Sequence, residues 1–326
     1  MKVFVTGGAG YIGSHVVRLL LESGHCVRVY DNLSEGHAAA IPAEALFRGD
    51  LADETRLAEG LAGGWDCVMH FAANCYVGES MENPEKYYCN NVVGSLRLVM
   101  AMRKAGVGRI VFSSSAATYG NPVTVPISEG HPNAPINAYG QTKLDFEVAL
   151  GYYAAAYGLG YAALRYFNAA GASPDAKIGE DHDPETHLVP VVLQVALGQR
   201  EAVSLFGTDY PTPDGTCIRD YVHVYDLAQA HILAMQAIRP GKGLTFNLGN
   251  GAGYSVREVI EAARRITGHA IPVKEGPRRA GDPPSLVASS ERIIRELGWK
   301  PQYPAIQSII ETAWRWHKSH PGGYGD

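Results

Sequence analysis

A tyrosine and a lysine four positions apart, Tyr139 and Lys143, are the pattern in this 326-residue chain that points most directly to chemistry. Residues at this spacing share one face of a helix, and a lysine ammonium beside a phenol favours the phenolate. To act as a base near neutral pH, a phenol needs roughly 4 kcal/mol of preference for its ionised form. One cation at about 4 Å supplies that order of energy at an effective dielectric constant near 20, although burial opposes it. We therefore expect Tyr139 to be a general base that Lys143 activates together with a second positive group.

A run of serines supplies hydroxyl groups for the same site. Ser113, Ser114 and Ser115 end an apolar segment that we expect to be a buried strand, and ligands bind at the carboxyl edge of open parallel sheets. Ser115 would bridge the substrate hydroxyl and Tyr139 and guide the proton. The Tyr-Lys spacing alone also fits a surface tyrosine beside a solvated lysine. The serine run and a glycine turn near the N-terminus favour the catalytic interpretation.

The glycine turn follows the first apolar segment of the chain. Gly7, Gly10 and Gly13 form a variant of the dinucleotide-binding fingerprint, and Tyr11 and Ile12 lie within it. Residues without Cβ let backbone N–H groups approach a pyrophosphate and let the following helix pack close to the strand. A tight turn without a ligand would use the same residues. The buried strand before it and the amphipathic helix after it favour a dinucleotide site.

The second apolar segment ends in an acidic residue, Asp31. It follows Gly13 at about the ~20-residue spacing expected of a carboxylate that binds the adenosine ribose. A carboxylate there would repel a 2′-phosphate, so we expect NAD rather than NADP, with the positive nicotinamide ring as the second cation near Tyr139. The alternative for Asp31 is a turn cap before Asn32. Asp50, after a third strand, would meet the adenine amino group.

Composition narrows the functional class. The 28 Lys and Arg against 33 Asp and Glu leave a net charge of −5, which gives no reason to expect nucleic acid or an anionic membrane as partner. The five cysteines are scattered without a Cys-x-x-Cys pair, so we expect neither a metal site nor disulfides, and a reduced cytoplasmic setting. No apolar run approaches the roughly 20 residues needed to span a bilayer, and the N-terminus starts with a strand pattern rather than a signal peptide.

Hydrophobic patterning predicts an α/β fold. Apolar runs typical of buried parallel strands alternate with amphipathic stretches at 14–21 and 84–104, which indicates a doubly wound parallel sheet of the Rossmann type with a second, smaller α/β substrate domain. We expect a cofactor domain over 1–169, with a returning segment near 217–249, and a mainly substrate-binding domain over 170–326. The five strands most clearly indicated are 3–5, 26–30, 67–71, 109–113 and 162–166.

Several motifs together resemble the extended short-chain dehydrogenase/reductase family: residues 6–13, 70–73, 112–115, 139–143 and 165–168. Motifs of the second half are similar to the UDP-sugar 4-epimerases of that family: 90–92, 206–212, 214–216, 218–224, 277–279, Gly281 with Asp282, and a tail that runs to Asp326. The resemblance covers essentially the whole chain. It implies further cofactor contacts from Asn32, Leu51, Phe71, Ala72, Ala73, Asn90, Ser113, Lys143 and Tyr166.

The resemblance implies an isomerase that interconverts UDP-glucose and UDP-galactose. C4 would be oxidised, the 4-keto sugar would rotate, and C4 would be reduced again from the other face. Such chemistry requires tightly retained NAD, firm anchoring of UDP and loose contacts to the hexose. A homodimer is also implied, with the helices near 84–104 and 139–157 packed against their mates.

The resemblance also implies the substrate contacts. Arg219 and Arg279 suit the diphosphate because guanidinium groups form charge-assisted bonds to phosphate oxygens. The alternative for both is an interdomain salt bridge to Asp220 or Asp282. Phe206 would flank uracil, Asp282 would meet the uridine ribose, and Asn168 a phosphate or sugar oxygen. The remaining substrate contacts expected are His187, Leu188, Tyr221 and Leu286.

Three positions depart from well-known bacterial relatives. Cys75 replaces a lysine near the cofactor ribose, so one NAD contact is expected to be missing. His187 replaces a frequent asparagine and fits a loop hydrogen bond as well as a ligand contact. Leu286 replaces a tyrosine that is frequent in relatives confined to plain hexoses, so UDP-N-acetylhexosamines and UDP-pentoses remain open as substrates.

Two rival functions can be weighed from the same residues. Nucleotide-sugar 4,6-dehydratases place an Asp-Glu pair after the strand-end Ser or Thr, whereas this chain has Ala116 and Ala117, which cannot move protons. A non-catalytic NAD-binding protein would typically have lost Tyr139 or Lys143, and both are present. An epimerase is therefore the expected function.

Overall fold

The computed structural model describes residues 1–279 and 282–325. Gly281 and Asp326, which belong to motifs named above, lie outside the described residues. None of the helices in the described part of the chain is long and apolar enough to cross a membrane.

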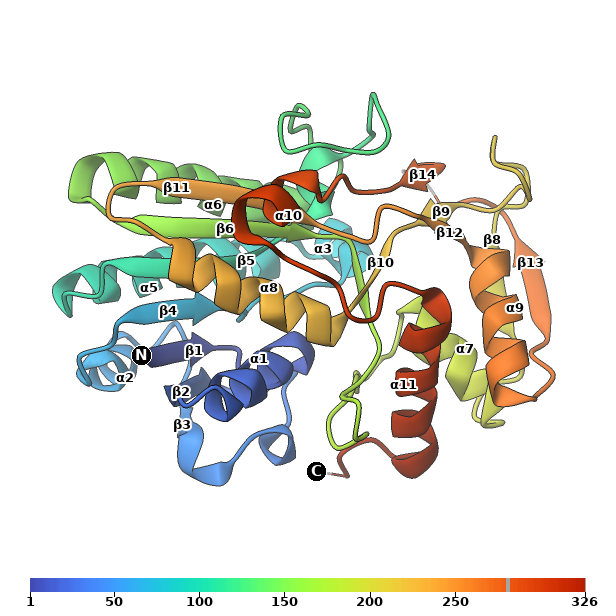
Figure 1. Ribbon diagram of the computed structural model, residues 1–326, viewed down its shortest axis with the longest axis horizontal. Helices are drawn as coiled ribbons and strands as arrows, with labels where there is room; N and C mark the ends of the chain where they lie inside the picture. The colour runs from blue at the N-terminus through green and yellow to red at the C-terminus, as the bar shows by residue number, and fades with distance from the viewer. Residues whose placement is uncertain (280–281, 326) are drawn as a thin grey trace.

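A seven-stranded parallel sheet organises the first part of the molecule (Figure 1). Its strand order, β11-β6-β5-β4-β1-β2-β3, places the first strand inside the sheet with crossovers to both sides, which confirms the predicted doubly wound class. The strands are β1 (Lys2–Thr6), β2 (Cys26–Asp31), β3 (Leu46–Arg48), β4 (Cys67–His70), β5 (Arg109–Ser115), β6 (Gly160–Tyr166) and β11 (Gly243–Leu248).

Helices cover both faces of this sheet, as Figure 1 shows. On one face, α1 (Tyr11–Glu22), α8 (Val224–Ala237) and α10 (Glu291–Leu297) bury side chains in one hydrophobic cluster with the strands. On the other face, α2 (Glu54–Leu61), α5 (Ser95–Lys104) and α6 (Ala138–Tyr157) form a second cluster with the sheet. The continuous apolar strands are buried because helices cover both of their faces.

The helix predicted over 84–104 is interrupted by a π-helical segment. It consists of α4 (Pro84–Tyr87), the π-helical turn η3 (Tyr88–Gly94) and α5. Hydrophobic spacing reports the exposed and buried faces of a helix but not a local change in its hydrogen-bond pattern, so the sequence did not predict this segment. The short helices α3 (Val77–Glu82), η1 (Ala38–Ala40), η2 (Ala43–Ala45) and η4 (Ala116–Tyr119) lie in loops.

The second part of the molecule combines three helices with short strands. Helices α7 (Leu188–Ala196), α9 (Val256–Thr267) and α11 (Ile306–Ser319) share a separate hydrophobic cluster, which lies beside the main sheet in Figure 1. The strands pair as β7 (Asn168–Ala170) with β10 (Tyr221–His223), β8 (Val203–Phe206) with β13 (Val273–Gly276), and β9 (Ile218–Arg219) with β12 (Tyr254–Ser255) and β14 (Ser285–Leu286).

Candidate active site

The carboxyl ends of six neighbouring strands carry most of the residues that the sequence singles out. The glycine turn follows β1, Asp31 ends β2, Asp50 follows β3, and residues 71–73 follow β4. Ser115 and Tyr166 end β5 and β6, which are paired in register at these two residues. The parallel sheet thus brings these side chains to one edge, where open α/β sheets bind ligands.

Backbone contacts explain two of the three glycines in the turn. A Cβ on Gly7, whose φ is +69°, would overlap the backbone of Ala72, and a Cβ on Gly13 would overlap the Gly7 carbonyl group. A Cβ on Gly10 would meet only the Gly7 carbonyl oxygen, at an ordinary 3.5 Å. The fold therefore does not itself require glycine at position 10, at the start of α1. A ligand approaching the helix N-terminus would require it, so the turn fits a bound pyrophosphate.

Asp31 fixes the backbone around this turn. Its Oδ2 accepts the Ala9 N–H at 2.9 Å and its Oδ1 accepts the Leu33 N–H at 2.9 Å. The carboxylate therefore has the turn-capping role that the sequence left open, and its contact to a ribose stays a prediction. Asp50 accepts a hydrogen bond of 2.7 Å from the Asn32 side chain, which links the ends of β2 and β3.

The predicted catalytic residues lie together and are buried. Tyr139 is hydrogen-bonded to Ser115, and the Lys143 Nζ lies 5.8 Å from the centroid of the Tyr139 ring. Asn137 caps α6 by accepting the Gly140 N–H at 2.8 Å, and the helix then places Tyr139 and Lys143 on its buried face. Lys143 donates to the Ser113 carbonyl oxygen at 2.8 Å. Strand β5 and helix α6 thus hold the phenol, the serine hydroxyl and the ammonium group in one place.

Burial dominates the proton affinities at this site. It raises the pKa of Tyr139 well above the usual value, while the hydrogen bond with Ser115 lowers it. Burial also lowers the pKa of Lys143 to about 8. The effect of Lys143 on the phenol, expected from the spacing, is therefore smaller than the effect of burial. Activating Tyr139 requires the further positive group that the sequence argument invoked.

Residues that the sequence analysis did not single out support the catalytic pair. Ser80, on α3, accepts the Tyr139 N–H at 3.2 Å. Glu147, one turn beyond Lys143 on α6, forms a buried ion pair with Arg165 and accepts a hydrogen bond from Ser114. Helix spacing identifies Glu147 as a neighbour of Lys143, but only the tertiary structure reveals its partners.

Some expected cofactor residues use their side chains for packing. Ile12 and Phe71 pack against one hydrophobic cluster, and Leu51 and Ala72 lie in or against the other. Such residues would meet a ligand mainly through their backbone. Other expected cofactor residues make polar contacts within the protein. Tyr11 donates a hydrogen bond to the Gly171 carbonyl oxygen at 2.7 Å, and Asn90 donates one to Asn91 at 3.0 Å. The Ser113 and Tyr166 hydroxyls share a hydrogen bond of 2.6 Å, and Ala73 follows β4. Cys75, where relatives have lysine, is exposed.

The expected nucleotide-binding residues of the second part lie in one region. Arg219 forms an ion pair with Asp282, as the alternative interpretation of the sequence allowed. The Arg279 guanidinium lies 4.1 Å from the centroid of the Phe206 ring, and Phe206 is 37% exposed. Asp220 instead accepts backbone N–H groups, including that of Gly251 at 2.9 Å. An exposed aromatic ring is thus combined with two guanidinium groups.

Leu286 connects this region with the end of β5. It is paired with Arg219 in the short sheet and packs against the cluster that contains Ala116 and Tyr119. Asn168 is paired with Tyr221, whose side chain is buried in the hydrophobic cluster of α7, α9 and α11. His187 directly precedes α7, which begins at Leu188, and its Nδ1 lies 3.0 Å from carboxylate oxygens of Glu180 and Glu185. The sequence analysis did not single out either glutamate.

Comparisons with known proteins agree with this geometry. The sequence profile of the NAD dependent epimerase/dehydratase family matches residues 3–249. UDP-glucose 4-epimerase from Halalkalibacterium halodurans is 56% identical, over 99% of this chain and 98% of its own. The structure of UDP-glucose 4-epimerase from Brucella ovis in complex with NAD is 49% identical and covers 96% of this chain and 97% of its own, with a TM-score of 0.92. The enzyme from Bifidobacterium longum in complex with NAD+ and UDP is 38% identical and covers 99% and 100%, with a TM-score of 0.94. The chain belongs to the NAD dependent epimerase/dehydratase family, as its motifs predicted.

Proposed function

We propose that this protein is an NAD-dependent isomerase that interconverts UDP-glucose and UDP-galactose. The observation that carries this proposal is the buried Ser115–Tyr139 hydrogen bond with Lys143 beside it, at the sheet edge that also carries the glycine turn. The full-length similarity to UDP-glucose 4-epimerases supports the same reaction.

Tyr139 would exchange a proton with the 4-hydroxyl of the sugar, and Ser115 would hold both oxygen atoms within hydrogen-bonding distance. Bound NAD would supply a reversible hydride acceptor and a positive ring near the phenol. Gly7, Gly10 and Gly13 would bind its pyrophosphate, and the positions around Asp31 and Asp50 its adenosine. Lys143 is held by the Ser113 carbonyl, which keeps its ammonium group beside Tyr139.

Substrate binding would depend on the nucleotide rather than on the sugar. Phe206 offers an exposed ring for uracil, and Arg219 and Arg279 offer guanidinium groups for the diphosphate. Asp282 already pairs with Arg219, so it would both orient that guanidinium and contact the ribose. Asn168, His187, Leu188 and Tyr221 complete the proposed substrate set. Weak contacts to the hexose would leave it free to present either face of C4.

The identity of the sugar depends on Leu286. Leu286 is paired with Arg219 and packs against the cluster that contains Ala116, directly after β5, which supports a role for its apolar side chain near the sugar. A UDP-N-acetylhexosamine or a UDP-pentose is the alternative substrate. We expect Leu286→Tyr to reduce turnover of UDP-N-acetylgalactosamine relative to UDP-galactose if the site accepts both sugars.

We further propose that residues 1–169, with the segment 217–249, form the cofactor domain, and that residues 170–326 mainly bind the substrate. A cytoplasmic homodimer is the proposed form of the protein. The five free cysteines suit a reducing compartment. Exposed apolar side chains on two neighbouring helical segments offer a dimer surface: Tyr88, Val93, Met100, Val148, Tyr152 and Tyr157.

The purified protein should convert UDP-galactose to UDP-glucose without added NAD, followed by chromatography with Tyr139→Phe as the inactive control. UDP-N-acetylgalactosamine and a UDP-pentose should be tested in parallel. If no UDP-sugar is converted even when NAD is supplied, the catalytic proposal fails and a non-catalytic NAD-binding role replaces it.

A further inference from the structure

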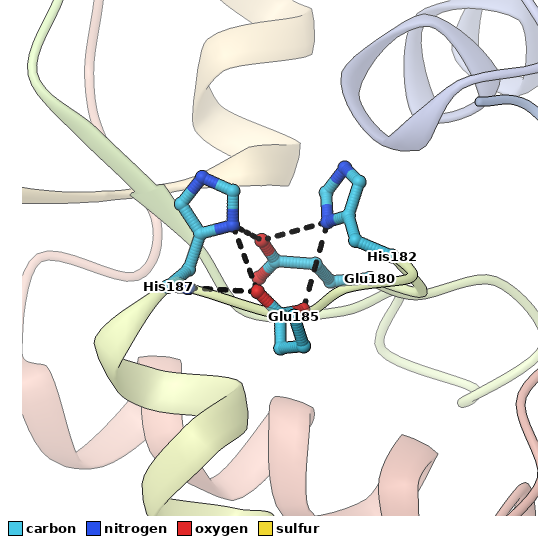
Figure 2. Close-up of side chains that lie close together, drawn as sticks. All are labelled: Glu180, His182, Glu185 and His187. Carbon is cyan, nitrogen blue, oxygen red and sulfur yellow. Dashed lines mark hydrogen bonds and ion pairs between the residues drawn. The ribbon is translucent and has the colours of Figure 1, made fainter. Parts of the chain in front are cut away.

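Four potential metal ligands gather in the segment between β7 and α7. They are Glu180, His182, Glu185 and His187, shown in Figure 2. One ligand atom from each lies within 4.8 Å of every other, and among the described residues this is the one group of three or more His, Cys, Asp or Glu side chains that meets this criterion. This group contains no cysteine, so the cysteine spacing could not predict it.

The spacing of these atoms fits a tetrahedral metal site. His182 Nδ1 lies 3.5 Å from Glu180 Oε1 and 3.6 Å from Glu185 Oε2, and the same ring nitrogen has no hydrogen-bond partner in the described structure although it is buried. His187 Nδ1 lies 3.0 Å from Glu180 Oε1 and 3.0 Å from Glu185 Oε1. Zinc–ligand bonds of about 2.0–2.2 Å correspond to tetrahedron edges of about 3.3–3.6 Å. The His182 distances fall in that range, and the His187 distances of 3.0 Å lie below it, so one cation could bridge both rings and the carboxylates after a small outward shift of the His187 ring.

Surrounding groups hold the ligands in this orientation. Glu185 Oε1 accepts the N–H groups of Thr186 and His187, each at 2.7 Å, which leaves Oε2 facing His182. The Glu180 carbonyl oxygen accepts the Trp316 indole N–H at 3.2 Å, which ties this residue to α11. Figure 2 shows the second ring nitrogen of both histidines pointing away from the carboxylates. In protein metal sites the second nitrogen of a bound histidine usually donates a hydrogen bond to a carboxylate, a carbonyl group or water.

A cation has both room and a path to these ligands. A cavity of about 100 Å³ is lined by Glu180, His182, Glu185 and His317, together with residues of the C-terminal turn. The side chains of the two glutamates are almost fully buried, at 4% and 3% exposure, so their negative charges are withheld from water. Two buried carboxylates need two compensating positive charges, which either the two protonated histidines or one divalent cation can provide.

We propose that Glu180, His182, Glu185 and His187 bind one zinc ion. Two imidazoles and two carboxylates form a neutral four-coordinate zinc site, whereas calcium and magnesium prefer six or more oxygen ligands. With all four positions filled by protein groups, the site is structural rather than catalytic. His187 would bind zinc through Nδ1 and keep its outward-pointing ring nitrogen for the substrate contact proposed above.

The proposed zinc ion would fix the start of α7 against the cofactor part of the molecule. His187 directly precedes α7, and the His182 ring lies 6.3 Å from the ring of Tyr11 at the start of α1. Tyr11 also donates a hydrogen bond to Gly171, in the same connecting segment. The inference does not depend on the proposed reaction, because metal content is measured without a substrate.

The first test is the metal content of the wild-type protein, purified from zinc-supplemented medium and measured by mass spectrometry. We expect one zinc per chain, its removal by a chelator with a fall in Tm, and recovery of both on adding one equivalent of zinc. Cobalt substitution should give the intense visible absorption of a tetrahedral ion. Absence of zinc from the protein, with no rise in Tm on zinc addition, would overturn the proposal.

Matched variants locate the site. His182→Gln should lose most of the zinc, while His320→Gln, which changes another histidine lining the same cavity, should keep it. Glu185→Gln provides a second ligand change if His182→Gln does not fold. Equal zinc content in His182→Gln and His320→Gln would show that the metal binds elsewhere and would also overturn the assignment.

Without a metal, the same cluster is a network of ion pairs. Burial opposes protonation of His182, but the neighbouring carboxylates of Glu180 and Glu185 outweigh it and raise its pKa to about 10. This metal-free network is the state that the negative result would establish.

Discussion

Two buried polar clusters respond to burial in opposite ways. In the cluster at the end of β5, burial moves both ionisable groups toward their neutral forms, since it raises the pKa of Tyr139 and lowers that of Lys143 to about 8. In the cluster before α7, burial is opposed by neighbouring charges. There, two neighbouring histidines lower the pKa of Glu185 despite its burial, and the pKa of His182 is raised to about 10.

The difference lies in the partners of each group. Tyr139 and Lys143 contact hydroxyl and carbonyl groups, which leaves desolvation as the dominant influence. The cluster before α7 combines two acids with two bases, so each charge is matched within a few ångströms. A group held near its neutral form can exchange a proton with a substrate, whereas a matched set of charges stabilises a fixed geometry. The first arrangement suits catalysis and the second suits anchoring.

The largest effect should follow the loss of one hydroxyl from the first cluster. We expect Tyr139→Phe to reduce the rate of UDP-galactose conversion by about 10³-fold, within the 10²–10⁴ typical of general acid–base catalysis. Its Tm should stay close to that of the wild type, because the ring still fills its buried position. His182→Gln should lower the rate far less. Comparable rate losses in the two variants would remove the functional distinction between the clusters.

A pair of glycine variants tests how the backbone supports the first cluster. Gly13→Ala should destabilise the fold by about 1–3 kcal/mol, because the added methyl overlaps the Gly7 carbonyl group. Gly10→Ala should leave the stability of the cofactor-free protein nearly unchanged but reduce the amount of NAD that co-purifies. Urea denaturation and the NAD content of the purified protein measure the two effects. Equal losses of stability would contradict the separate roles assigned to these glycines.

A buried histidine whose pKa is lowered should make the stability of the fold sensitive to acid. Burial lowers the pKa of His231, on α8, to about 4, the opposite of the shift at His182. Between about pH 6.5 and 4, His231 is protonated in the unfolded chain but neutral in the folded chain. The free energy of unfolding therefore falls as the pH falls, by up to about 1.4 kcal/mol per pH unit. His231→Met removes this titration.

Urea denaturation at pH 7 and pH 5 measures how much stability the wild type and His231→Met each lose on acidification. The wild type should lose about 2 kcal/mol more than His231→Met over this interval. A loss of equal size in both proteins would show that His231 is not held neutral by burial.

The smallest effect should come from an ion pair on the surface. Arg18 on α1 donates two hydrogen bonds, of 2.7 and 2.9 Å, to Asp175. Asp175 precedes the group formed by Glu180, His182, Glu185 and His187, the Glu/His cluster. Both side chains are about one third exposed, at 33% and 36%. Asp175→Asn should therefore cost about 0.2–1 kcal/mol, and less at high salt. A larger cost, insensitive to salt, would mean that this pair shares the anchoring role given to the buried cluster.

The residues that could be predicted from the sequence are those fixed by regular elements. The spacing of Tyr139 and Lys143 places them on one helix face, and the apolar runs identify the strands whose ends carry Ser115 and Asp31. The family resemblance extended the prediction to Arg219 and Arg279. The ring stacking between Arg279 and Phe206 was not predicted, because it joins a loop to a short strand distant in sequence.

The Glu/His cluster was missed for a related reason. The spacing Glu-x-His-x-x-Glu-x-His is visible in residues 180–187, but no periodic element indicates that these side chains converge. Their convergence depends on tertiary contacts, such as the hydrogen bond from Trp316 to the Glu180 carbonyl. The π-helical turn η3 escaped prediction because its side-chain pattern is that of an ordinary helix.

The position of β11 in the main sheet has a consequence for synthesis of the chain. Residues 243–248 form the strand that pairs with β6, so a nascent chain that ends near residue 169 leaves one edge of β6 without its partner. An unpaired edge can recruit strands from other chains, and long-range pairing slows folding. Completion of the sheet must therefore wait until about half of the second part has been translated. Expression of residues 1–169 alone should yield an aggregation-prone fragment rather than an independent cofactor-binding unit.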